Sequence, residues 1–333
     1  MEMKGKLLDV SNLKVSFYTY RGVVKALNGV DLWMDSGERL GVVGETGCGK
    51  SVTSLAVMRL IEQPGEIQEG KVIFNGTNLV ELSEEKMNRV RGVEMSMIFQ
   101  EPRSSLNPVM KVGYQIGESI AKSKKIKIKQ TYPEVKEMLR LVGLDPERVM
   151  NSYPHELSGG MSQRVMIGMG LASHPKLLIA DEPTSALDVT IQAQILDLLR
   201  DLRQQSRLAT LLITHDLAVV AEAADAVAVM YAGKIVETAP VAELFEAPSH
   251  PYTQGLFASL PAVNQPGKRL ATIEGVVPPI TAFPTGCRFH PRCSHAMPIC
   301  RAQEPPLMCG AASHPTACWL HQEPGNATGS GVS

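Results

Sequence analysis

The chain has 333 residues, a length that suggests two domains, or one large domain with an appendage. Because 44% of its residues are hydrophobic and 20% charged, it can bury a sizeable core. Its net charge of −1 gives no reason to expect nucleic acid as the main partner. No signal peptide is recognisable at the N-terminus, and no stretch approaches the ~18 apolar residues of a membrane span. We therefore expect a soluble chain, or one that reaches a membrane only through other proteins.

The first predicted elements are strands. Residues 7–35 alternate apolar and polar side chains, which predicts antiparallel strands packed against the core that follows. Three aromatic residues, Phe17, Tyr18 and Tyr20, lie about two dozen residues before a glycine-rich loop. If that loop binds a nucleotide, one ring could stack on adenine, and Tyr20 is our choice. All three could equally be ordinary sheet residues.

Residues 44–51 fit the phosphate-loop pattern G-x-x-x-x-G-K-[ST] at every fixed position. A short apolar strand over 39–43 precedes the loop, and a helix predicted over 52–61 follows it. Backbone N–H groups of such a loop surround phosphate oxygens, and the helix directs its positive end at the same anion. Lys50 would reach the β- and γ-phosphates, and the Ser51 hydroxyl would bind Mg²⁺. The predicted ATP-binding residues here are Gly44, Glu45, Thr46, Gly47, Cys48, Gly49, Lys50 and Ser51.

Two further strands and a helical region follow. Residues 70–80 look like a strand that ends in an Asn-Gly turn, and 95–99 like a short buried strand that stops at Gln100. From about 101 to 165 the pattern becomes helical, which suggests an insertion. The lysines between 122 and 129 are predicted to form a solvated face or loop rather than a binding patch.

The next elements complete a parallel sheet. A buried strand over 177–182 ends in two acids, a helix is predicted over 191–202, and a buried strand over 210–214 ends at His215. Alternating strands and helices with buried strands indicate a parallel α/β sheet, whose ligands bind beyond the carboxyl ends of the strands. Because the phosphate loop, Gln100, the two acids and His215 all follow such ends, we expect one active site.

Each of these polar residues suits a step of ATP hydrolysis. Asp181 can hold Mg²⁺ through water, and Glu182 can polarise the water that attacks the γ-phosphate. Gln100 can sense Mg²⁺ or that water, and His215 could contact the γ-phosphate. The predicted Mg²⁺ site is thus Ser51, Gln100 and Asp181. A strand-end acid pair can also serve only as a cap, and a single Gln or His is often structural.

A second anion site is predicted at Ser158, Gly159 and Gly160. This turn opens a helix over 163–171 and offers N–H groups and a hydroxyl. One chain needs only one cradle for a γ-phosphate, so a second cradle implies a second nucleotide.

Over about residues 7–245 the chain resembles an ABC-transporter ATPase subunit, because the motifs occur in that family's order. They are the phosphate loop, Gln100, Leu157–Gly160, Leu177–Glu182, Ser185–Asp188 and His215. The resemblance implies that Asp188 also belongs to the ATP site. It implies a head-to-tail dimer in which each ATP lies between one subunit's phosphate loop and the other's Ser-Gly-Gly turn. Met161 stands where the family has Gln, and we expect little loss from this.

Three further segments resemble the oligopeptide/dipeptide importer branch, nearest to its dipeptide-permease D-type subunits: residues 104–108, 158–164 and 250–253. This implies an ATPase that energises import of di- and oligopeptides, attached peripherally to the cytoplasmic face of the cell membrane. The implied partners are a second ABC ATPase subunit (a paralogue), two transmembrane permease subunits and, indirectly, an extracytoplasmic solute-binding protein. The alternatives are another solute, nickel or an oligosaccharide, and an ABC-type ATPase that acts on nucleic acid.

The expected fold is therefore an α/β P-loop NTPase of the ABC type over residues 1–246, with an antiparallel β subdomain. Residues 247–333, which we call the C-terminal extension, are rich in Pro, Cys and His and are expected to form a small irregular module. Its last residues, 324–333, are predicted to be disordered.

The C-terminal extension holds five of the six cysteines, four of which are candidate ligands: Cys287, Cys293, Cys300 and Cys318. Four thiolates in a short Pro-rich segment suit an iron–sulfur cluster or Zn²⁺. The resemblance implies a [4Fe–4S] cluster, with Zn²⁺ or no metal as alternatives. Cys309 could replace one of the four. Zn²⁺ stays an alternative because four histidines nearby could also be ligands, namely His290, His295, His314 and His321.

Overall fold

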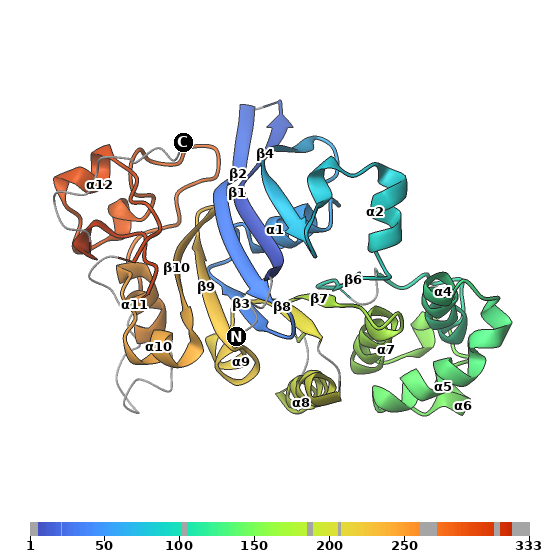
Figure 1. The fold of residues 1–333 in the computed structure, drawn as a ribbon. Helices are drawn as coiled ribbons and strands as arrows, with labels where there is room; N and C mark the ends of the chain where they lie inside the picture. The colour runs from blue at the N-terminus through green and yellow to red at the C-terminus, as the bar shows by residue number, and fades with distance from the viewer. Residues whose placement is uncertain are drawn as a thin grey trace, which may run out of the picture.

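The computed structural model describes residues 6–20, 22–101, 105–184, 189–205, 208–259, 272–309 and 314–321. Two sheets lie at its centre, with helices around them (Figure 1). None of the described helices is long and apolar enough to cross a membrane.

The first sheet is antiparallel and has the strand order β2-β1-β4-β5. Its strands are β1 (Lys6–Thr19), β2 (Gly22–Asp35), β4 (Gly65–Phe74) and β5 (Thr77–Asn78). The alternation expected over 7–35 is present, since Leu8, Val10 and Val30 are buried with hardly any exposed surface. The predicted Asn-Gly turn joins β4 to β5, with both residues at positive φ. The prediction of antiparallel strands is confirmed.

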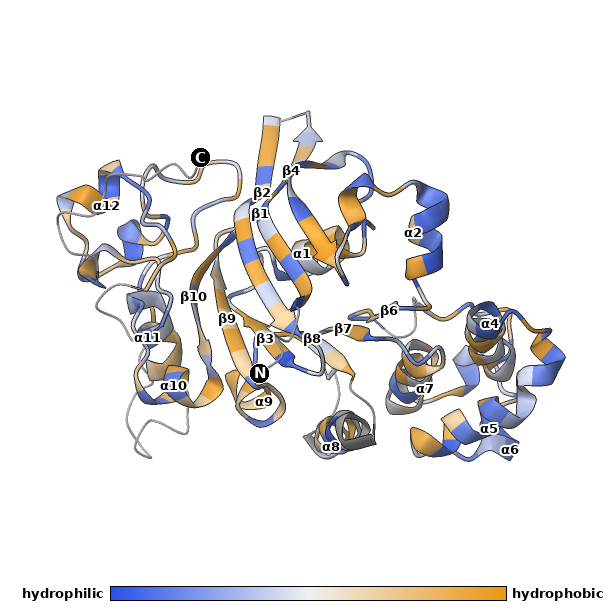
Figure 2. Cartoon of the chain, in the orientation of Figure 1, coloured by the Kyte–Doolittle hydropathy of each residue, from blue (hydrophilic) through white to orange (hydrophobic). Residues whose placement is uncertain are grey.

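The second sheet has the order β10-β9-β3-β8-β7-β6, and every neighbouring pair is parallel except β9 with β10. Its strands are β3 (Arg39–Val43), β6 (Met95–Ile98), β7 (Leu177–Asp181), β8 (Ala209–Thr214), β9 (Ala226–Tyr231) and β10 (Lys234–Pro240). Hydrophobic residues are concentrated along these strands (Figure 2), because helices or the other sheet cover them.

The strand register brings the carboxyl ends of β3, β6, β7 and β8 to one edge. Val43 pairs with Thr214, Asp181 with Ile213, and Ile98 with Ala180. The loops that follow these four strands therefore start side by side. This arrangement confirms the expected parallel α/β sheet and places its ligand-binding edge.

Helices surround the two sheets. They are α1 (Lys50–Val57), α2 (Glu84–Val90), α4 (Val112–Lys124), α5 (Tyr132–Leu141), α6 (Pro146–Val149), α7 (Gly159–Leu171), α8 (Val189–Gln205), α9 (Leu217–Ala223), α10 (Val241–Glu246), α11 (Pro251–Ala258) and α12 (Pro298–Ala302). In Figure 1, α4 to α7 gather at one end of the sheet, and α10 to α12 lie at the other. The lysines between 122 and 129 are exposed at and beyond the end of α4, which agrees with the prediction of a solvated face.

The helix after the phosphate loop differs from its prediction. It begins at Lys50 and ends at Val57, not over 52–61. Gly49, at φ +110, caps its start, and Arg59 has a left-handed backbone with φ 51, so the helix cannot continue. Apolar spacing alone placed the start of the helix two residues too late and its end four residues too late.

The C-terminal extension packs against β9 and β10. The carboxylate of Glu237, on β10, is fully buried and accepts hydrogen bonds from the amides of Ser249 (2.6 Å) and His250 (3.1 Å). His314 Nε2 lies 2.6 Å from the same carboxylate. Rings of Tyr252 and Phe289 pack on Tyr231 of β9. One buried acid thus ties three separate segments of the chain together.

Candidate nucleotide-binding site

The phosphate loop connects β3 to α1 and needs glycine for steric reasons. A Cβ at Gly44 would lie 2.1 Å from the carbonyl oxygen of Met230, on neighbouring β9. A Cβ at Gly49 would approach a methyl group of Leu27 to 2.9 Å. Gly47 has a positive φ with open space beside it. The loop is therefore shaped by its neighbours before any anion binds.

Lys50 lies over this loop. Its ammonium group is almost fully buried and donates to the carbonyl oxygens of Gly44 (2.7 Å) and Glu45 (3.2 Å). A lysine held in this way stands beside the loop's concave face, where its charge can meet phosphate oxygens. The structure therefore places the Lys50 ammonium group against the loop that the sequence predicts to bind phosphate.

A candidate Mg²⁺ site joins β7 to α1. The Ser51 hydroxyl donates to Asp181 across 3.2 Å, and both groups are the oxygen donors that Mg²⁺ prefers. Burial raises the pKa of the Asp181 carboxyl, the Ser51 hydrogen bond opposes this, and the nearby Glu182 charge adds to the rise. A divalent cation would reverse this effect, so the residues present fit the ion.

Glu182 is the centre of the polar residues beyond the sheet. Gln100 Nε2 donates to one of its carboxylate oxygens at 2.9 Å, and His215 Nδ1 lies 3.0 Å from the other. Its backbone has φ 47, a left-handed conformation that is strained for a glutamate. Its amide donates to the carbonyl oxygen of Ile213 across 2.8 Å, which holds that turn in place. Loops from three parallel strands thus bring an amide and an imidazole to one carboxylate.

The Ser-Gly-Gly turn opens α7. Ser158 is the N-cap and accepts from the Met161 amide at 3.3 Å, and a Cβ at Gly159 would meet nothing within 4 Å. The turn is exposed, and α7 stands with α4 and α5 at one end of the sheet, away from α1 (Figure 1). The residues at this helix start, Ser158 and Gly159, therefore lie at the surface of the chain, where a ligand from outside can reach them.

Of two further predicted ATP contacts, Tyr20 and Asp188, the structure describes only Tyr20. Tyr20 is 91% exposed at the tip of the β1–β2 hairpin, whereas Phe17 packs on the core and Tyr18 donates to Gln68 from the sheet. Of the three rings, Tyr20 is the one most open to a ligand. Asp188 lies outside the described residues.

Sequence reasoning missed several residues around the site. Gln163 of α7 donates to the carbonyl oxygen of Pro183 across 2.5 Å, which ties that helix to the end of β7. The Glu45 amide, expected among the phosphate donors, donates to the hydroxyl of Tyr252 at 2.9 Å. Arg292 forms an ion pair with the Glu45 carboxylate. Tyr252 lay in a segment already noted as distinctive, but no local pattern pointed to its contact.

The four predicted cysteine ligands lie around one small enclosed cavity in the C-terminal extension. Burial raises the pKa of the Cys287 and Cys318 thiols to about 11, and the other thiols contribute. Cys309 is exposed and does not line this cavity. A shared cavity with four thiols suits a thiolate-held group. Among the described residues, however, no three His, Cys, Asp or Glu side chains are arranged to hold a single metal ion.

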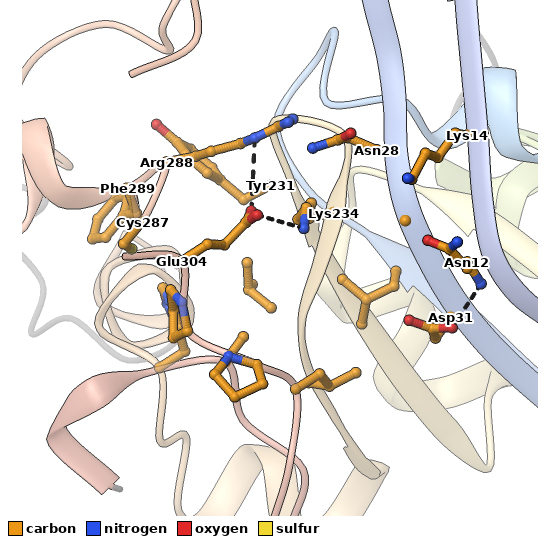
Figure 3. A pocket seen from close by; sticks show the side chains of 18 residues that line it. Asn12, Lys14, Asn28, Asp31, Tyr231, Lys234, Cys287, Arg288, Phe289 and Glu304 are labelled. Atoms are coloured by element: carbon orange, nitrogen blue, oxygen red, sulfur yellow. Dashed lines mark hydrogen bonds and ion pairs between the residues drawn. The ribbon is translucent and has the colours of Figure 1, made fainter. Parts of the chain in front are cut away.

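A cavity of about 500 Å³ lies elsewhere, between the antiparallel sheet and the C-terminal extension (Figure 3). Lys234 on its wall pairs with Glu304 at 2.8 Å, and on the opposite wall the Asn12 backbone amide donates to the Asp31 carboxylate at 2.8 Å. None of its described lining residues belongs to the predicted ATP site. This cavity is therefore distinct from the candidate nucleotide-binding site.

Two family models match the sequence. One, described as ABC transporter, matches residues 27–185, and the other, described as oligopeptide/dipeptide transporter, C-terminal region, matches 236–300. The sequence is 52% identical to the oligopeptide transport ATP-binding protein OppD of Bacillus subtilis, over 95% of this chain and 89% of that protein. It is 48% identical to the dipeptide transport ATP-binding protein DppD of Escherichia coli, over 94% of this chain and 96% of that protein.

Solved structures agree on the fold. A dimeric post-hydrolysis structure of the ATP-binding cassette MJ0796 with ADP and Pi matches with a TM-score of 0.64 and 24% identity, over 70% of this chain and 98% of that one. The structure of cbiO1 from Clostridium perfringens, part of the transporter complex cbiONQ, matches with a TM-score of 0.60 and 26% identity, over 72% of this chain and 91% of that one.

Proposed function

The chain belongs to the ABC transporter family, among the ATP-binding proteins of oligopeptide and dipeptide transporters, and we propose that the residues at the carboxyl edge of its central sheet bind and hydrolyse ATP. It is an ATPase that energises the import of di- and oligopeptides. The observation that carries the site assignment is the convergence of Gln100 and His215 on Glu182, next to Asp181 and Ser51.

In the proposed site, the phosphate loop from Gly44 to Ser51 holds the phosphates, with Lys50 facing the β- and γ-phosphates. Ser51, Asp181 and Gln100 would hold Mg²⁺, which neutralises phosphate charge during the reaction. Tyr20 stacks on the adenine from its exposed position on the hairpin. Asp188 is proposed as a further contact on the basis of the family's motif order.

Glu182 acts on the attacking water. Its carboxylate is largely buried, and the contacts with Gln100 and His215 fix both of its oxygens. A carboxylate whose rotamer is fixed can orient a water in line with the γ-phosphate and accept its proton. In this proposal Gln100 reports the presence of that water to the helical region that follows it, and His215 contacts the γ-phosphate.

We propose that the Ser158–Gly160 turn serves the nucleotide of a second subunit. Ser158 and Gly159 are exposed at the start of α7, and the N–H groups of a helix start are the usual setting for an anion. Two such subunits, arranged head to tail, would close on two ATP molecules. The second subunit is proposed to be a paralogue, with two transmembrane permease subunits and an indirect solute-binding protein as the other partners. In this proposal the chain lies at the cytoplasmic face of the membrane, with residues 1–246 as its ATPase domain.

We further propose that Cys287, Cys293, Cys300 and Cys318 hold a [4Fe–4S] cluster, with Zn²⁺ as the alternative. The support is the shared cavity and the exclusion of Cys309 from it. A cluster would supply the staple that a short, Pro-rich segment lacks. Anaerobic purification with iron and zinc analysis separates the two: about four iron atoms per chain support the cluster, and one zinc with no iron refutes it.

The transport function is tested by reconstitution. The chain is combined with its genomic neighbours encoding permease and ATPase subunits in vesicles, and uptake of a labelled dipeptide is measured with and without ATP. ATP-dependent uptake that is lost on Lys50→Ala supports the proposal. Uptake of nickel or an oligosaccharide in place of the peptide would contradict it.

A further inference from the structure

The C-terminal extension touches the phosphate loop directly. Arg292 places its guanidinium against the Glu45 carboxylate in a two-pronged ion pair, with N–O distances of 2.7 and 3.1 Å. The two residues are 247 positions apart in the chain, and only 4% of the Arg292 side chain is exposed. Paired N–H···O bonds of this kind fix orientation as well as distance.

A second contact holds the main chain of the same residue. The Glu45 amide donates to the hydroxyl of Tyr252, at 2.9 Å, and that ring is completely buried among Tyr231 and Phe289. Arg292 also lies 3.5 Å from the Tyr231 hydroxyl. The second residue of the phosphate loop is thus held by its backbone and by its side chain, both from one packed surface.

The ion pair is not needed merely to attach the extension. Glu237 already binds Ser249, His250 and His314, and Arg288 donates to the carbonyl oxygen of Ala232. Burying an arginine has a desolvation cost of several kcal/mol that a good partner only offsets. The pair joins an almost fully buried arginine to a glutamate whose side chain is 27% exposed, and its position at this loop calls for a role beyond adhesion.

That role follows from the charges around Glu45. The Lys50 ammonium lies 3.2 Å from the Glu45 carbonyl oxygen, so the glutamate is next to the lysine that the phosphates require. An unpaired carboxylate on this loop would repel phosphates bound to it. Arg292 neutralises that carboxylate and holds it back.

We propose that Arg292 and Tyr252 are positioning residues for ATP binding, through which the C-terminal extension keeps Glu45 from interfering with the phosphate cradle. This rests on the proposed ATP site.

The test measures the dissociation constant of MgATP for the full-length protein by calorimetry. Arg292→Gln should weaken binding about tenfold, which corresponds to ~1.4 kcal/mol. Glu45→Gln alone should tighten binding, since it leaves a positive charge beside the loop. The double variant should recover most of the affinity that Arg292→Gln loses, and Arg292→Lys should lie between the wild type and Arg292→Gln.

Arg288→Gln is the matched control, because this buried arginine of the same extension contacts Ala232 and Glu304 rather than Glu45. The affinity of this variant for MgATP should equal that of the wild type. Unfolding temperature and metal content report whether each variant keeps its fold. A wild-type affinity in Arg292→Gln, or a double variant as weak as Arg292→Gln, overturns the proposal. If Arg292→Gln does not fold, Arg292→Lys and Glu45→Gln still decide it. Wild-type binding in Lys50→Ala would instead refute the ATP site itself.

Discussion

Glu237 should be the main anchor of the C-terminal extension, and Glu237→Ala tests this. The change removes the carboxylate that accepts from the amides of Ser249 and His250, and that lies against His314. Each buried donor left without an acceptor costs ~1–3 kcal/mol. Some water will enter the space left by the side chain, so we expect the low end of the summed costs of these donors. The free energy of unfolding should fall by about 3–5 kcal/mol, the range found for broken buried pairs.

The assay is urea unfolding followed by the fluorescence of Trp319, which lies in the extension, in a Trp33→Phe background. The matched control is Glu85→Ala, which removes a fully solvated pair with Arg89 and should cost less than ~0.5 kcal/mol. A loss of under ~1 kcal/mol for Glu237→Ala would show that the buried acid does not hold the extension.

Three other predictions concern the site and the cysteines. Burial raises the pKa of Asp181, so its ionised form is destabilised at neutral pH in the absence of a cation. Asp181→Asn should therefore raise the unfolding temperature of the Mg²⁺-free protein and abolish the further rise on adding MgATP. A lower unfolding temperature of the Mg²⁺-free variant would contradict this. Ser158→Arg should leave ATP binding by its own chain intact but block hydrolysis at the partner's loop, and full activity in a mixed dimer would refute the shared site. Cys318→Ser should lose the bound metal whereas Cys309→Ser keeps it; the reverse outcome would mean that the fourth ligand is misassigned.

Much of the site was predictable because each part has a local signature. The phosphate loop is a contiguous motif, and Gln100, Asp181 and His215 each follow a short apolar run. Parallel strands carry such residues to one edge whatever the loops between them do, so their proximity follows from topology.

Contacts between distant segments were not predictable. Nothing near Glu45 indicates Arg292, and Glu237 sits in an ordinary strand where an acid would be expected to face solvent. The start of α1 was misplaced because its first turn is set by backbone geometry at Gly49 rather than by apolar spacing. A contact between two single residues that are far apart in the chain produces no repeating pattern in the sequence, so sequence periodicity cannot predict it.

The most direct test of the account is ATP hydrolysis by the assembled transporter carrying Glu182→Gln. The glutamine keeps the shape of the side chain and leaves the phosphate loop unchanged, but it cannot accept a proton from water. We predict that ATP still binds with wild-type affinity while the hydrolysis rate falls at least ~100-fold, the usual contribution of a general base. A hydrolysis rate within a few fold of wild type would contradict the assignment of Glu182 and, with it, the catalytic role of the residues gathered around it.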